Sequence, residues 1–142
     1  IAGHIMCKAP REEIGYMGRM VCVQEISAVT AACMMVKTSV FKAVGGFDEE
    51  LKVAFNDIDI CMKVRKYGVK IIFTPYAELY HYESKSRGME DTPEKQLRFS
   101  REVNCFRRKW ERELLKGDPY YNPNLTLNNT DCSLRKQEKN GD

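Results

Sequence analysis

The stretch over residues 55–74 joins the period of a helix directly to the pattern of a strand, and this junction constrains the fold more than any other feature of the chain. In FNDIDICMKVRKYG, residues 55–68, apolar side chains recur three and four positions apart, which predicts an amphipathic helix that stops at Gly68. The run VKIIFT, residues 69–74, is rich in β-branched and aromatic side chains and predicts a strand that Pro75 ends. A helix followed at once by a strand favours an α/β fold.

The two acids at the start of this helix face different ways. Asp57 lies on the inward stripe, which it shares with three apolar residues: Ile60, Cys61 and Val64. Asp59 lies on another side, where Lys63 can pair with it four positions later, so we expect Asp59 to be a solvated helix charge. For a carboxylate aimed at the interior two explanations stay open: either Asn56 or Asp57 caps the helix, or Asp57 has a functional role.

Other segments continue the alternation of strands and helices. The apolar run at 26–36 predicts a buried strand, residues 38–46 predict a short helix, and residues 77–82 predict a second strand-like piece. The tail from residue 118 onwards has little periodicity, so we expect it to be extended and held in place by its tyrosines.

A second amphipathic helix is predicted over residues 92–117, because Thr92 and Pro93 form a helix start and Gly117 a helix end. Its apolar stripe consists of Phe99, Val103, Phe106, Trp110 and Leu114. An apolar helix face exposed to water favours association with another chain, and so does a sheet edge with unpaired N–H and C=O groups. We therefore expect the chain to associate with itself.

Composition is that of a globular protein and gives little support to nucleic-acid binding. A hydrophobic content of 43% is enough for a core, and no apolar run approaches the roughly 18 residues that span a bilayer. The net charge of +3 is too small to indicate a nucleic-acid partner. Three acids, Glu102, Glu111 and Glu113, also interrupt the basic face of the 92–117 helix, so we expect no nucleic-acid partner.

Several common kinds of site are excluded by spacing. The six cysteines form no Cys-x-x-Cys pair and the two histidines give no zinc-finger spacing, so we expect a reducing compartment rather than a disulfide framework. The phosphate-loop patterns GxGxxG and GxxxxGK[ST] are both missing. Asp57 and Asp59 have the spacing of an Asp-x-Asp metal motif, but side chains two positions apart on a helix diverge, so this pair does not suit a nucleotide-bound metal.

Two segments have a familiar order of motifs: AVTAACMMVKTSVFKAVGGFDEEL and FNDIDICMKVRKYGVKIIFTPYAELYHYESKSRG, within about residues 24–88. They resemble the C-terminal half of family 2 glycosyltransferases of the GT-A fold. The later segment RFSREVNCFRRKWERELLKGDPYYNPNLTL is similar to a subgroup tied to surface-polysaccharide or O-antigen assembly. The resemblance implies the C-terminal part of a GT-A (Rossmann-like) mixed sheet flanked by helices, followed by a long amphipathic helix and an extended tail.

The same resemblance assigns roles on the acceptor side. Asp57 matches the second residue of the family's Glu-Asp pair, which implies the general base of an inverting transfer. Asn56 stands where the family more often has an acid, and this is expected to alter acceptor contacts without removing the base. Thr30, Ala31 and Ala32 align with a small-residue strand end that faces donor and acceptor, with packing inside a strand as the alternative.

On the donor side, His81 matches the family histidine that helps bind a divalent metal or the donor diphosphate. The alternative is a histidine satisfied by a backbone group at a strand end. Lys85 and Arg87 lie on the following loop, where they would either meet the diphosphate or be ordinary solvated residues. The implied cofactor is Mg²⁺ or Mn²⁺, mostly held by the N-terminal half that the resemblance does not cover.

These implications give one leading hypothesis. The chain is expected to belong to an enzyme that transfers a sugar from a nucleotide-sugar donor to a saccharide or lipid-linked saccharide acceptor in cell-surface polysaccharide synthesis, and to be inactive by itself. We expect a cytoplasmic location, and peripheral association of the full-length protein with the inner face of the membrane stays open. The alternative is a non-catalytic binding module with the same scaffold.

The predicted organisation has three parts. Residues 1–91 form the acceptor-side half of a GT-A domain, residues 92–117 form the amphipathic helix, and residues 118–142 form an extended or partly disordered tail.

Overall fold

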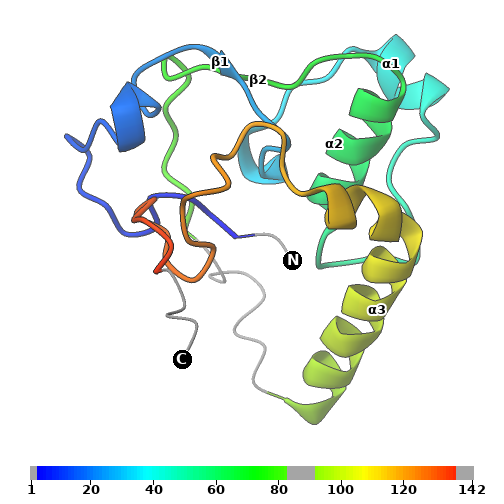
Figure 1. The fold of residues 1–142 in the computed structure, drawn as a ribbon. Helices are drawn as coiled ribbons and strands as arrows, with labels where there is room; N and C mark the ends of the chain where they lie inside the picture. The colour runs from blue at the N-terminus through cyan, green and yellow to red at the C-terminus, as the bar shows by residue number, and fades with distance from the viewer. Residues whose placement is uncertain (1–2, 83–91, 137–142) are drawn as a thin grey trace.

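The computed structural model describes residues 3–82 and 92–136 (Figure 1). Two predicted site residues, Lys85 and Arg87, lie outside the described residues. In chain order the elements are the 3₁₀ turn η1 (Tyr16–Gly18), strand β1 (Gln24–Glu25), the 3₁₀ turn η2 (Ala31–Cys33), helices α1 (Thr38–Ala43) and α2 (Asn56–Lys66), strand β2 (Ile72–Phe73) and helix α3 (Pro93–Lys116).

A small antiparallel sheet joins β1 to β2. Gln24 lies opposite Phe73 and Glu25 opposite Ile72, and the Ile26 N–H extends the pairing by donating to the Ile71 carbonyl at 3.0 Å. Helices together with this two-stranded sheet are compatible with the predicted α/β class. The predicted strand over 69–74 is therefore confirmed at its centre, although it is shorter than its sequence pattern indicates.

Two of the predicted strands are absent from the described part of the chain. Residues 26–30 are followed by the turn η2 rather than by a continuing strand, and residues 77–82 carry no strand assignment. Of these two segments only Ile26 bonds to the described two-stranded sheet, and a strand is stabilised by its cross-strand neighbours rather than by propensity alone. Met35, near the end of the apolar run, is 100% exposed, and no residue of 26–36 is buried, so the predicted burial of 26–36 is wrong.

Helix α2 follows its prediction closely. It spans Asn56–Lys66, the chain reverses at Gly68 with φ 90°, and the stripe residues Ile60, Cys61 and Val64 are buried. The cap, however, is neither of the predicted residues: Phe55 occupies the N-cap position in a left-handed conformation and makes no side-chain capping bond.

The prediction that Asp59 is solvated is wrong. Its side chain is fully buried, with Oδ1 accepting hydrogen bonds from Trp110 Nε1 at 2.8 Å and lying 2.7 Å from Lys109 Nζ. The predicted pair with Lys63 does form, at 3.0 Å from Oδ2. Asp59 is buried because α3 covers the side of α2 that a single-helix argument leaves to solvent.

Helix α3 also follows its prediction. Thr92 Oγ1 accepts from the Lys95 N–H at 3.4 Å, Pro93 begins the helix, and Gly117 ends it with φ 76°. The helix is kinked at Trp110 (φ −116°, ψ 20°), which Figure 1 shows as a change of direction near its C-terminal end. No helix among the described residues combines the length and the apolar content needed to cross a bilayer.

The core forms where α3 meets α2 and the loop before it. Leu51, Phe106 and Trp110 are buried together, and the residues packed against them are Phe55, Ile58, Met62, Cys105 and Leu114. The α3 stripe is therefore largely covered within the chain, which removes that reason for expecting self-association. Phe99 is the most exposed member of the stripe, at 43%.

The tail after α3 is more ordered than predicted over its described residues. Leu125 and Leu134 form an antiparallel bridge, and the Tyr121 hydroxyl donates to the Thr126 carbonyl at 2.9 Å. Figure 1 shows the orange and red tail returning toward the N-terminal segment, where Asn122 Nδ2 donates to the Tyr16 hydroxyl at 3.3 Å. The prediction that tyrosines hold this tail in place agrees with these contacts.

Candidate active site

Asp57 lies on the first turn of α2 and is half-buried. Its Oδ2 accepts a hydrogen bond from the Ala31 N–H at 3.3 Å, and its Oδ1 accepts from the Ile58 N–H at 2.8 Å. Both donors are backbone groups, and the N-terminus of a helix also favours negative charge. The carboxylate is thus held in a defined place, with oxygen lone pairs left over for another donor.

The turn η2 forms the other side of this site. Thr30 precedes the turn, and its hydroxyl accepts the Ala32 N–H at 3.4 Å, which orients the backbone so that the Ala31 N–H meets Asp57. Ala31 and Ala32 are exposed, so the surface beside the carboxylate is made of small side chains open to solvent. The structure therefore brings Thr30, Ala31 and Ala32 together with Asp57 in a turn, and packing inside a strand no longer explains them.

Asn56 is the first residue of α2 and is half-buried. Asn56 directly follows Phe55. The φ of Phe55, 64°, lies in the left-handed region that residues other than glycine rarely adopt. This turn sets the direction in which the helix begins, and with it the direction in which the side chains of its first turn leave the backbone.

His81 is exposed on the segment that follows β2. That segment contacts the N-terminal part of the chain, where Arg11 pairs with Glu78 at 2.7 Å. No hydrogen bond or ion pair within the described ranges joins His81 to Asp57. Its proposed role toward a metal or a diphosphate stays a prediction.

The described residues do not by themselves fit a divalent metal. Over 3–82 and 92–136, no group of three or more His, Cys, Asp or Glu side chains lies close enough together to hold an ion.

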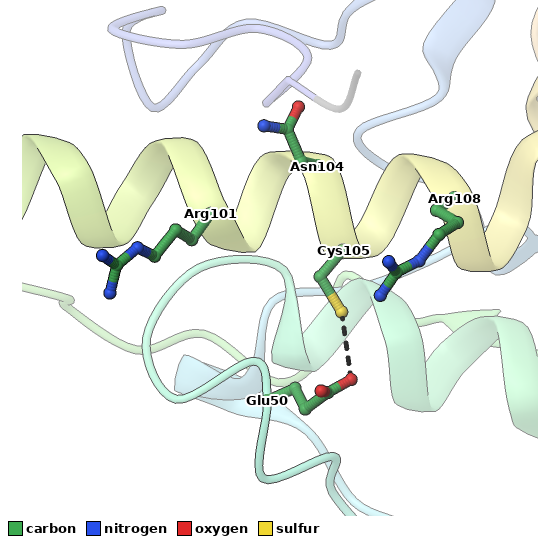
Figure 2. A pocket seen from close by; sticks show the side chains of 5 residues that line it. All are labelled: Glu50, Arg101, Asn104, Cys105 and Arg108. Atoms are coloured by element: carbon green, nitrogen blue, oxygen red, sulfur yellow. Dashed lines mark hydrogen bonds between the residues drawn. The ribbon is translucent and has the colours of Figure 1, made fainter.

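One hollow on the surface lies between α3 and the loop before α2, and has a volume of about 430 Å³. Figure 2 shows the Cys105 thiol and Arg108 directed toward Glu50, whereas Asn104 points away and Arg101 extends along the helix. Cys105 Sγ donates to Glu50 Oε2 at 3.4 Å, and burial, followed by this carboxylate, raises the pKa of the thiol. Because the two arginines do not converge, the hollow does not resemble a binding site for one anion.

Sequence reasoning did not identify this hollow. Glu50 and Cys105 are 55 residues apart in the chain, and no periodic pattern connects them. A second hollow of about 350 Å³ is lined by Val44, Lys63, Lys66, Tyr67, Lys109 and Trp110. Neither hollow is lined by Asp57.

Three relatives show what the chain is similar to. It is 53% identical over 135 residues to the uncharacterized protein y4gI of Sinorhizobium fredii, a match that covers 94% of this chain. It is 34% identical over 142 residues to the O-antigen biosynthesis protein RfbC of Myxococcus xanthus, covering 99% of this chain. It is 32% identical over 62 residues to the N-acetylglucosaminyl-diphospho-decaprenol L-rhamnosyltransferase of Mycobacterium tuberculosis, covering 44% of this chain.

The names of two of these relatives support a relationship to glycosyltransferases. The chain spans only a small part of each relative: 15% of the first, 11% of the second and 20% of the third. No family model and no solved structure matches the chain.

Proposed function

We propose that this chain is the acceptor-side part of an inverting, family 2-type glycosyltransferase of the GT-A fold, with Asp57 as its general base. The observation that carries the proposal is the Asp57 carboxylate, held by the Ala31 N–H at 3.3 Å beside an exposed turn of small residues. Relatives named for O-antigen biosynthesis and for rhamnosyl transfer support the reaction class.

The proposed reaction is a single displacement at the anomeric carbon of the donor sugar. An acceptor hydroxyl forms the new carbon–oxygen bond while the bond from that carbon to the nucleoside diphosphate breaks, and the diphosphate leaves with the electron pair. The hydroxyl proton passes to Asp57, which is a general-base step. A carboxylate held by two backbone N–H groups suits this role because it has oxygen lone pairs free to accept the proton.

The small side chains of the η2 turn suit the acceptor. Ala31 and Ala32 leave room beside the carboxylate for a sugar ring to approach, and Thr30 and Asn56 supply polar groups nearby. The proposed acceptor is a saccharide or a lipid-linked saccharide, and the proposed pathway is cell-surface polysaccharide synthesis. A nucleotide sugar is the proposed donor, with His81 as this chain's contribution to binding its diphosphate.

The test is a substitution at Asp57 in the full-length protein that contains this chain. Asp57→Asn should lower the rate of sugar transfer by about 10²- to 10⁴-fold while the affinity for the nucleotide sugar stays unchanged, because a base acts in the chemical step. Transfer is measured with a radiolabelled donor, and donor affinity by calorimetry.

Glu49→Gln is the matched control, since Glu49 is an exposed acid in the preceding loop. Asp59→Asn is unsuitable as a control because Asp59 is buried. A full transfer rate in Asp57→Asn would show that Asp57 is not the general base, whereas absence of transfer by the wild-type full-length protein would favour the alternative of a non-catalytic binding module. An equal loss of donor affinity would assign Asp57 to donor binding instead.

A further inference from the structure

Glu102 on α3 is a buried carboxylate directed at the backbone just ahead of α2. Only 3% of the residue is exposed, and Oε2 accepts a hydrogen bond from the Ala54 N–H at 2.7 Å. Arg98 Nε lies 3.8 Å from the other oxygen, Oε1. A charge removed from water is costly unless it is paired or hydrogen-bonded, and a bond from a backbone N–H to a carboxylate is among the stronger hydrogen bonds.

The residue after Ala54 is strained and held by the same face of α3. Phe55 has φ 64° and ψ 5°, a left-handed conformation that is unfavourable for a residue with a Cβ. Its ring stacks on Phe106 with centroids 5.1 Å apart and lies 5.8 Å from Phe99. A strained backbone conformation of this kind persists only where contacts with the surrounding structure hold it in place.

Three side chains of α3 provide those surroundings. Phe99, Glu102 and Phe106 are spaced i, i+3 and i+7, so they lie on one face of the helix and together hold residues 54 and 55. The Phe55 carbonyl in turn accepts the first bond of α2, from the Asp59 N–H at 2.8 Å. The direction in which α2 begins is therefore set by α3, and Asp57 is the second residue of that helix.

We propose that Glu102 is a positioning residue for Asp57: through the Ala54 N–H it fixes the start of α2 so that the Asp57 carboxylate meets the Ala31 N–H. The expected effect of Glu102 on sugar transfer rests on the proposed function. The coupling of Glu102 to the Asp57–Ala31 contact does not depend on that function and can be measured without it.

The first experiment follows backbone amides of the 142-residue chain by nuclear magnetic resonance. Glu102→Asp keeps the charge but shortens the reach, so the Ala54 and Ala31 N–H signals should both shift and exchange with D₂O at least tenfold faster. Glu102→Gln keeps an oxygen acceptor at the same reach and should restore both. The Thr126 N–H, which donates to the Ser133 carbonyl at 2.8 Å in the tail, should be unaffected in either variant.

The second experiment measures transfer by the full-length protein. Glu102→Asp should lower kcat by about ten- to a hundredfold with KM for the donor unchanged, because misplacing a base slows only the chemical step. Glu102→Gln should recover most of that loss. Glu111→Gln, an exposed acid on the same helix, is the control and should behave as the wild type.

The two experiments separate the possible failures. If Glu102→Asp changes the Ala54 amide but leaves the Ala31 amide as in the wild type, Glu102 only stabilises the loop and the inference is overturned. If the Ala31 amide responds but Asp57→Asn transfers sugar at the full rate, the coupling stands and the proposed function fails. If Glu102→Asp does not fold, an unchanged Ala31 amide in a folded Phe99→Leu variant, which loosens the packing on Phe55, would equally overturn the inference.

Discussion

Trp110 Nε1 donates a 2.8 Å hydrogen bond to Asp59 Oδ1, and this buried contact joins the kink of α3 to the first half of α2. Lys109 pairs with the same oxygen at 2.7 Å and with Asp48 at 2.5 Å, so one ammonium group ties α3 to both α2 and the loop ahead of it. Lys63 adds a bond to the Gly46 carbonyl at 3.0 Å. The network therefore connects three segments around a carboxylate with no access to solvent.

Asp59→Asn should destabilise the fold by about 2–3 kcal/mol, since it leaves two lysines without their shared counter-charge. We do not expect the larger loss of folding free energy that follows when a fully buried ion pair is broken, because the side chains of Lys63 and Lys109 are partly exposed, at 19% and 29%. Trp110 is the only tryptophan, so its fluorescence reports this contact directly during urea unfolding. A variant as stable as the wild type would show that the network adds nothing to stability.

The Asp48–Lys109 pair should make stability depend on pH on the acid side. The hydrogen bond from Lys109, with a backbone bond from Glu50, holds the pKa of Asp48 below its usual value of 3.8. A group with a depressed folded-state pKa contributes stability that is complete above the unfolded pKa and is lost as pH falls through the folded one. The stability lost in Asp48→Asn should thus be full at pH 7 and shrink below about pH 4. Urea midpoints for both proteins across this range test the sign, and parallel curves would contradict it.

Cys105 should become more reactive when Glu50 loses its charge. Burial raises the pKa of the thiol most, and the hydrogen bond to Glu50 raises it further. Glu50→Gln removes the negative charge, which lowers the pKa and increases the thiolate fraction at a fixed pH. Alkylation by iodoacetamide at pH 8, followed by mass spectrometry, should be faster at Cys105 alone. The exposed thiols of Cys7, Cys22 and Cys33 are internal references, and an unchanged rate at Cys105 relative to them would refute the assignment.

Gly46→Ala should destabilise the chain more than Gly45→Ala. Both glycines have positive φ, 65° and 80°, so either substitution carries a backbone cost of about 1 kcal/mol. A Cβ at Gly46 would also lie 3.1 Å from the Phe41 ring, whereas nothing lies within 4 Å at Gly45. Thermal unfolding followed by circular dichroism compares the two variants, and equal melting temperatures would mean that the Phe41 ring moves aside at no cost.

The sequence by itself determined the two long helices and much of their inward faces. Their signals are local: Thr92 and Pro93 begin α3, Gly68 and Gly117 follow the ends of α2 and α3, and apolar spacing selects the buried stripe. Such signals act within a few residues along the chain, so they can be read without knowing what packs against them.

Only the tertiary structure decided the surroundings of the two acids. Asp57 meets a backbone N–H that is 26 residues away in sequence, and Asp59 meets an indole 51 residues away. The run at 26–36 ends in a turn for the same reason, because a strand needs a partner and the described sheet offers it none beyond Ile26. Contacts between distant segments depend on how helices pack, and a pattern of three or four residues carries no record of that packing.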